Sequence, residues 1–235
     1  TWTIWTASTS SRWGRETRRA LDLGPVWGRG VPLELVHGIA AIKAAAAVVN
    51  GRHPAVPEVD PELAAASGRA ATDVALGRFD DQFPLDALQT GSGTATNMNV
   101  NEVIADRAGE LTGRTVHPND HVNACQSSND VVPSALRLFL AMCLRDRTLP
   151  ALDQLAGSLR ALAARHATTV TLGRTHLMDA TPVLLGDVVG GWAAQLDEAR
   201  APLERAMIAA TAVPLGGSAV GSRLNAPAGW AEAGG

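Results

Sequence analysis

Apolar residues recur at helical spacing through most of the chain. Those between 35 and 49 step alternately by four and three positions and stop at Asn50-Gly51, which predicts a first helix. Three prolines between 54 and 61 predict a loop, followed by an alanine-rich helix that ends near Gly77. A polar loop over 90–97 then leads into a third helix that runs to about Leu111. The first half of the chain is therefore expected to be helical.

The second half carries two longer patterns. Leucines at 152, 155, 159 and 162 share one helical face, and a series from Leu185 to Ala206 holds a 4, 3 step for three heptads. Such a repeat keeps one edge facing a neighbour, as in the long helices of a bundle. Val170 and Leu172 alternate with threonine over too few residues to predict a sheet. We predict an all-α fold, with a small N-terminal helical region (1–120) and part of a central helical bundle (121–235).

Composition narrows the class of protein. The 235 residues are 46% hydrophobic, enough for a sizeable core, and 20 Lys+Arg against 23 Asp+Glu give a formal charge of -3. No long run of one charge indicates nucleic acid or a membrane surface as partner. The most hydrophobic stretch is interrupted by Pro133, Ser134 and Arg137, which argues against a membrane span. Cys125 and Cys143 form no C-x-x-C pair, so we expect a reduced, cytoplasmic protein.

Three polar segments are the candidates for chemistry, and each is expected to be a loop that leads into a helix. They are Gly91-Ser-Gly-Thr-Ala-Thr-Asn-Met-Asn99, Cys125-Gln-Ser-Ser-Asn-Asp130 and Gly173-Arg-Thr-His-Leu-Met-Asp-Ala-Thr-Pro182. The first begins like a dinucleotide fingerprint, but Thr96 stands where the last glycine belongs. Hydroxyls and free amides at a helix start can bind a carboxylate, yet serine and threonine there are also ordinary caps. Both interpretations stay open for the first two segments.

His176 is the best candidate for proton transfer, because imidazole titrates nearest to neutral pH. A structural histidine is the alternative, and the company of Arg174, Thr175 and Asp179 favours a role in chemistry. His117 and His121 are four apart, as metal ligands on a helix would be, but Pro118 disfavours a helix there. We expect a turn with a local side-chain network and no metal.

Taken together, the three segments resemble the signature regions of the class II fumarases, within the fumarase and aspartase superfamily. The similarity runs from the block at 13–20 to the block at 215–221, and is strongest over 89–105, 116–130 and 173–186. His176 stands where aspartate ammonia-lyases typically have glutamine, which favours the fumarase branch. Three long motifs in the right order and spacing make this resemblance highly specific.

The resemblance implies reversible hydration of fumarate to L-malate, with neither a metal nor an organic cofactor. It also implies a homotetramer in which each active site is built from three subunits. His176 would take part in proton transfer. The residues implied to bind the C4 dicarboxylate are Ser92, Gly93, Thr94, Ser127, Ser128, Asn129 and Thr175. Those implied to form a second dicarboxylate site are Arg114, His117, Asn119 and Asp120.

Some features depart from the family. Arg15-Glu16 stands where Ala-Gln is usual, and Met178 replaces a frequent glutamine. The family's mobile Gly-Ser-Ser loop, which supplies a serine base and a lysine for the substrate, is not among the 235 residues, and no capping pattern precedes Gly235. We therefore expect a chain truncated at its C-terminus, with an incomplete site. The alternatives are an aspartate ammonia-lyase or another lyase of the superfamily, and a helical fragment that catalyses nothing.

Overall fold

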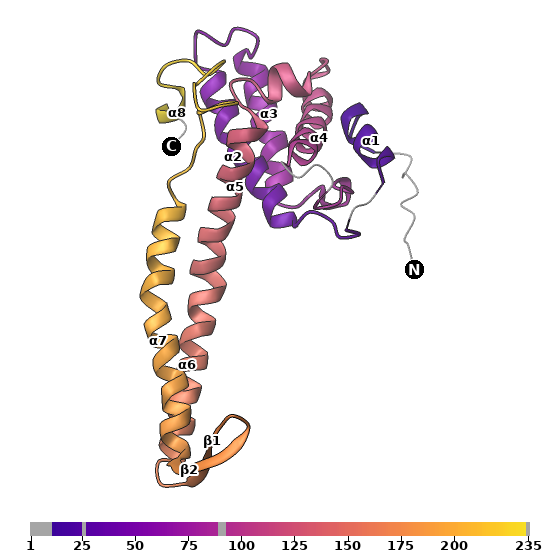
Figure 1. The fold of residues 1–235 in the computed structure, drawn as a ribbon. Helices are drawn as coiled ribbons and strands as arrows, with labels where there is room; N and C mark the ends of the chain where they lie inside the picture. The colour runs from indigo at the N-terminus through magenta and orange to yellow at the C-terminus, as the bar shows by residue number, and fades with distance from the viewer. Residues whose placement is uncertain (1–10, 25–26, 89–92, 234–235) are drawn as a thin grey trace. The chain divides into compact units, whose positions relative to one another are not determined.

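The computed structural model describes residues 11–24, 27–88 and 93–233, and most of these are helical (Figure 1). This confirms the predicted all-α class, with one β-hairpin as an exception. In chain order the elements are α1 (Arg15–Asp22), α2 (Leu33–Asn50), α3 (Pro61–Ala75), the 3-10 turn η1 (Asp80–Gln82), α4 (Thr94–Thr112), the π-helical turn η2 (Pro118–Val122), α5 (Ser128–Cys143), the π-helical turn η3 (Leu144–Thr148), α6 (Leu149–Arg165), β1 (Val170–Thr175), β2 (Met178–Leu184), α7 (Leu185–Ala210) and α8 (Trp230–Ala233).

The chain divides into two compact units. The first comprises residues 1–139 and 213–235, and the second comprises residues 140–212. These divisions fall at 139 and 212, whereas the sequence pattern suggested one near residue 120. The assignment of domains at residue 120 stays a prediction.

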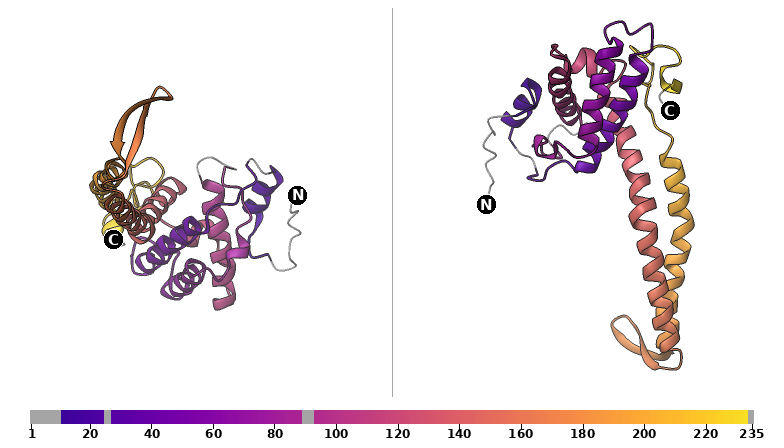
Figure 2. Two further views of the ribbon diagram at one scale, coloured as in Figure 1. Left: turned by 90° about the horizontal axis from the view of Figure 1, so that it is seen from below. Right: turned by 180° about the vertical axis from the view of Figure 1, so that it is seen from behind.

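The core of the first unit lies where α2, α3 and α4 pack together (Figure 2). Small side chains let the helices approach closely: a Cβ placed on Gly51 would lie 2.3 Å from Cβ of Ala64. Fully burying one large aliphatic side chain stabilises a fold by about 1.5–3 kcal/mol. The larger side chains buried here are Val36, Ile39, Ile42, Leu63, Val74, Val100, Val103 and Ile104.

The helix ends follow local signals that the sequence carries. Asp60 caps α3 by accepting a hydrogen bond from the Leu63 N–H (2.8 Å), with Pro61 in the first turn. Gly113 ends α4 with a positive φ of 66°, a conformation that favours glycine. The predicted helices over 35–49, up to about 77 and up to about 111 are confirmed within a few residues.

Helix α2 is the one described helix that is long and apolar enough, by length and composition alone, to cross a membrane. It has 18 residues with a mean hydropathy of 1.4, and 50% of that window is buried inside the structure. This helix lies outside the stretch interrupted by Pro133, Ser134 and Arg137, on which the argument against a membrane span was based. Packing of α2 against α3 and α4 accounts for its apolar composition, because that face forms the core.

The segment after α7 belongs to the first unit. Trp230 on α8 is 2% exposed, and its indole Nε1 donates a hydrogen bond of 2.6 Å to Oδ1 of Asn50 at the end of α2. The same ring packs in a second apolar cluster with Val49 and Val56. A buried indole with a satisfied N–H ties this segment firmly to α2.

In the second unit, α6 and α7 run side by side (Figures 1 and 2). Ala156, Val189 and Ala193 are buried along them, and Arg160–Asp197 and Arg200–Asp153 ion pairs join their exposed sides. A Cβ on Gly186 would lie 2.7 Å from the carbonyl oxygen of Ala163, so glycine is required where α7 begins. The two long helices that the leucine and heptad spacings predict are confirmed.

The third polar segment is not a loop that leads into a helix. It forms an antiparallel hairpin in which Val170 pairs with Leu184 and Thr175 pairs with Met178. The expectation that no strands form here was wrong. The reason is physical: both strands are largely exposed and the register shifts at Gly173, so no regular apolar alternation marks them in the sequence.

Candidate active site

Two of the three polar segments meet in the first unit, at the N-termini of α4 and α5. Gly93 precedes Thr94, the first residue of α4, and has a φ of 76°. A Cβ on Gly93 would lie 2.7 Å from Cγ1 of Val132 on α5, so only glycine fits this approach. Thr94 is exposed at the helix start. Ser92 lies outside the described residues.

The start of α5 carries the second set of candidates. The Ser127 N–H donates to Oδ1 of Asp130 (2.9 Å), and the Asn129 N–H donates to Oγ of Ser127 (3.2 Å). This is helix capping, the simpler of the two interpretations open from the sequence. Ser128 differs, because its Oγ accepts a hydrogen bond of 3.0 Å from Nδ2 of Asn97 on α4. That bond joins the starts of α4 and α5, where free amides and helix dipoles favour an anion.

Behind these residues lies a buried polar network that the sequence analysis missed. Lys43 on α2 is 1% exposed, and its Nζ donates to Oδ1 of Asn123 (3.0 Å) and to Oε1 of Gln126 (3.2 Å). Oδ1 of Asn123 also accepts from Nδ2 of Asn97 (3.2 Å). One signal was available: Lys43 is the sole lysine of the 235 residues, and it sits in an otherwise apolar stretch.

Burial perturbs the lysine strongly. Desolvation lowers the pKa of Lys43 from 10.5 to about 7, and the nearby Asp130 carboxylate opposes part of that shift. Among the described residues no carboxylate lies within ion-pair distance of Nζ, so two neutral amide oxygens are its hydrogen-bond acceptors. A buried ammonium is costly unless it is hydrogen-bonded, which makes both amides necessary to the fold.

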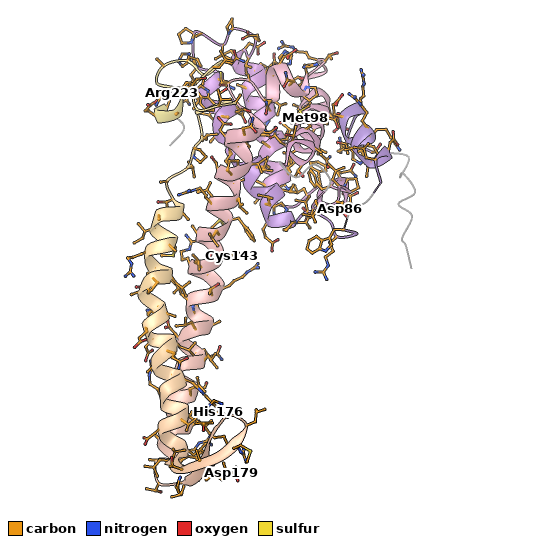
Figure 3. The ribbon with its side chains drawn as sticks, in the orientation of Figure 1. Asp86, Met98, Cys143, His176, Asp179 and Arg223 are labelled. Carbon is orange, nitrogen blue, oxygen red and sulfur yellow. The ribbon has the colours of Figure 1, made fainter. Side chains whose placement is uncertain are left out.

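Thr175 and His176 lie in the second unit, on the hairpin (Figure 3). His176 and Leu177 form the two-residue turn with φ values of 50° and 61°, as a type I′ turn requires. Arg174 donates from Nε to Oδ1 of Asp179 (3.1 Å), so Asp179 pairs with the arginine. The histidine is thus presented to solvent at the tip, and a neighbouring ion pair braces the strands.

The predicted second dicarboxylate site is partly assembled in the first unit. His117 and Asn119 line a cleft of about 560 Å³ together with residues of α1 and α4. Asp120 accepts a hydrogen bond of 3.1 Å from Nδ2 of Asn119. Arg114 does not line this cleft; its Nη1 instead pairs with Oδ2 of Asp60 (2.8 Å). The guanidinium therefore neutralises a helix cap at the start of α3.

The turn at His117 forms the predicted local side-chain network. The His117 N–H donates to Nδ1 of His121 (2.9 Å), and the Asp120 N–H donates to Nδ1 of His117 (3.1 Å). Nδ1 of each histidine therefore accepts a hydrogen bond from a backbone N–H. Within the described ranges, no group of three or more His, Cys, Asp or Glu side chains is placed to hold a metal ion.

Comparison with known proteins assigns the family. The model of the Lyase family matches residues 4–233, and the chain therefore belongs to that lyase family. Among solved structures, a class II fumarase from Schistosoma mansoni superposes with a TM-score of 0.87 at 37% identity, over 97% of this chain and 49% of that one. A fumarate lyase:delta crystallin from Brucella melitensis gives 0.86 at 36% identity, over 97% and 50%.

The chain is also similar to curated class II fumarate hydratases. The fumarate hydratase class II 1 of Pseudomonas aeruginosa is 48% identical over 227 residues, which are 94% of this chain and 48% of that protein. The fumarate hydratase class II of Thermosynechococcus vestitus is 46% identical over 226 residues, with 94% and 48% covered. The chain thus spans about half the length of the curated relatives it matches.

Proposed function

We propose that the protein is a fumarate hydratase, which interconverts fumarate and L-malate. The observation that carries this is the pair of helix N-termini in the first unit, where the side chains of Thr94, Ser127, Ser128 and Asn129 carry hydroxyl and amide groups. Donors of this kind at helix starts suit a carboxylate, and the similarity to class II fumarases supports a C4 dicarboxylate. Ser92, Gly93 and Thr175 complete the proposed binding set.

His176 is the proposed proton-transfer group. In the dehydration direction a base removes a proton next to one carboxylate of malate, and donors stabilise the dianionic enolate that forms. Hydroxide then leaves from the neighbouring carbon with the help of an acid. A solvent-exposed imidazole on a rigid two-residue turn can carry a proton in either direction. Arg114, His117, Asn119 and Asp120 are proposed to bind a second dicarboxylate. Of these, His117 and Asn119 line the cleft of about 560 Å³, whereas Arg114 pairs with Asp60 outside it.

Self-association and a cytoplasmic location belong to the same proposal. The second unit leaves large apolar side chains exposed on and next to its helices, which supports packing against other copies, as in a homotetramer. They are Leu140, Met142, Leu155, Trp192 and Ile208. Both cysteines are free thiols, which supports a reducing compartment. Light scattering at micromolar concentration tests the assembly, and a compact monomer would contradict it.

The function is tested with the protein expressed from its complete coding sequence in a host that lacks its own fumarases. We expect malate from fumarate and water, and no aspartate from fumarate and ammonia. A Ser128→Ala variant is the matched control for host contamination, because its KM for fumarate should rise if the activity belongs to this site. Aspartate formation would instead support the ammonia-lyase, and absence of both products would support a non-catalytic role.

A further inference from the structure

The polar network around Lys43 has a direction that hydrogen-bond chemistry fixes. While Lys43 is protonated, its ammonium has three donors and no acceptor, so any amide that faces it must present its oxygen. Asn123 and Gln126 do so, at 3.0 and 3.2 Å from Nζ. The amino group of Gln126 is then left to donate to the carbonyls of Val122 and Ala124. Lys43 therefore determines which way both amides point.

The orientation of Asn123 in turn fixes that of Asn97. Oδ1 of Asn123 uses one lone pair for Lys43 and offers the other to Nδ2 of Asn97, 3.2 Å away. If the Asn97 amide flipped, its oxygen would face the oxygen of Asn123, which is repulsive. Asn97 is fully buried, and its own Oδ1 has no hydrogen-bond partner in the described part of the chain. The two hydrogen bonds that the Asn97 amino group donates therefore fix the orientation of the side-chain amide.

Ser128 stands at the end of this chain of bonds. The second hydrogen of the Asn97 amino group donates to Oγ of Ser128 at 3.0 Å. A hydroxyl that accepts from an amide is left with its own O–H to donate. Within the described residues no acceptor is found for that O–H, and Ser128 is half-buried at the start of α5. The network therefore presents the serine as a donor at the proposed anion site.

We propose that Lys43 is a positioning residue for substrate, which acts through Asn123 and Asn97 to make Ser128 a hydrogen-bond donor to a carboxylate. This inference rests on the proposed function, because the carboxylate is that of the C4 dicarboxylate. Lys43 itself touches neither substrate nor reacting atoms. Its ammonium is well suited to the task, since it is a compact charge that presents its donors to both amide oxygens from inside an apolar core.

A double-mutant cycle on the protein expressed from its complete coding sequence tests this route. The probe is succinate, a saturated C4 dicarboxylate that cannot be hydrated, and calorimetry gives its Kd. Ser128→Ala and Lys43→Met should each weaken binding about tenfold, the size of losing one hydrogen bond to a charged group. In the Ser128→Ala background, Lys43→Met should change Kd less than twofold, because its effect passes through that hydroxyl.

The matched control replaces Thr175, a proposed binding residue on the hairpin of the second unit. Lys43→Met and Thr175→Ala should be additive. If the effect of Lys43→Met on Kd is additive with both Ser128→Ala and Thr175→Ala, the proposal is overturned. Additive effects in both cycles are what a lysine with a purely structural role would give. If Lys43→Met does not fold, Asn123→Leu breaks the same chain of bonds at its middle and must give the same pattern of coupling.

The outcomes separate this proposal from the proposed function. Succinate binding without turnover of fumarate overturns the hydratase activity alone, and the cycle still decides the role of Lys43. Fumarate turnover with an additive cycle overturns only the role of Lys43. Absence of succinate binding by the wild-type protein overturns the proposed dicarboxylate site and the role of Lys43 together.

Discussion

The Asp130 carboxylate on α5 holds the backbone of Ser218: its Oδ2 accepts a hydrogen bond of 2.8 Å from the Ser218 N–H, across 88 positions of sequence. Oδ2 also accepts from the Gly216 N–H (3.1 Å), and Oδ1 accepts from the Ser127 N–H (2.9 Å). One buried side chain therefore ties the segment after α7 to the start of α5. It also sets the backbone that presents Ser127 at the proposed anion site.

Replacing Asp130 with Asn should destabilise the first unit. An amide has one oxygen where the carboxylate has two, so its amino group would face a backbone N–H and leave that donor unpaired in the interior. We expect the free energy of unfolding to fall by about 2–3 kcal/mol, measured by equilibrium denaturation in guanidinium. Asp22→Asn, at an exposed position, makes the same change in charge and should stay within about 0.5 kcal/mol of the wild type.

The titration of Lys43 should be visible directly. Desolvation lowers its pKa to about 7, so the Nζ resonance of ¹⁵N-labelled lysine should titrate near neutrality. Lys43→Met identifies the signal by removing it. A midpoint near 10.5 would show that the side chain is hydrated in solution, contrary to its burial.

The same shift predicts a pH dependence of stability. The folded state loses the Lys43 proton near pH 7, whereas the unfolded chain keeps it up to about 10.5. Between these values the unfolded state holds more protons, so the unfolding free energy of the wild type should rise with pH relative to that of Lys43→Met. Below about pH 7 the difference should be flat. Parallel curves for the two proteins would count against the shift.

The turn at the tip of the hairpin makes His176→Asn a clean test of proton transfer. Asparagine tolerates positive φ, so the substitution should keep the type I′ turn and remove the imidazole as a proton donor and acceptor. We expect kcat to fall about 10²–10⁴-fold with little change in KM. Leu177→Asn is the matched control at the next position and should keep kcat. A variant at His176 that raises only KM would show a binding role instead.

The two cysteines should differ in reactivity. Cys125 is 9% exposed, and desolvation, with a smaller contribution from Glu58, raises its pKa to about 11. Cys143 is half-buried. Iodoacetamide at pH 8 should therefore modify Cys143 in the native protein and reach Cys125 only after unfolding, as read by peptide mass mapping. Cys143→Ser should abolish native labelling, and labelling of Cys125 in that variant would contradict its burial.

The 235-residue chain by itself should turn over fumarate slowly or not at all. The resemblance places a base and a substrate-binding lysine in a Gly-Ser-Ser loop that is not among these residues, and Lys43 is buried in the core. A purified 235-residue chain is compared with the Pseudomonas aeruginosa fumarate hydratase under the same conditions. Activity above a few per cent of that enzyme would show that these residues hold a complete site.

Much of the helical framework was predictable because helices obey local rules. The apolar spacing of α2 and the heptads of α7 lie within single segments, and Gly113 marks a helix end by its own backbone freedom. The hairpin was not predictable in this way. Its strands are largely exposed, so no sustained alternation of apolar and polar residues marks them in the sequence. Its turn uses His176 and Leu177 in place of the usual asparagine and glycine, so no typical turn sequence predicts a hairpin there.

The sequence by itself determined the helices, the family and the residue types that can bind a carboxylate, because motifs and periodicity are properties of short segments. Only the tertiary structure decided which polar side chains join the hydrogen-bond network around Lys43. The network joins four residues from separate stretches of the chain: Lys43, Asn123, Asn97 and Ser128. Packing of the first unit brings each one within 3.0–3.2 Å of the next. Hydrogen bonds act over a few ångströms, so their partners exist only once the core has formed.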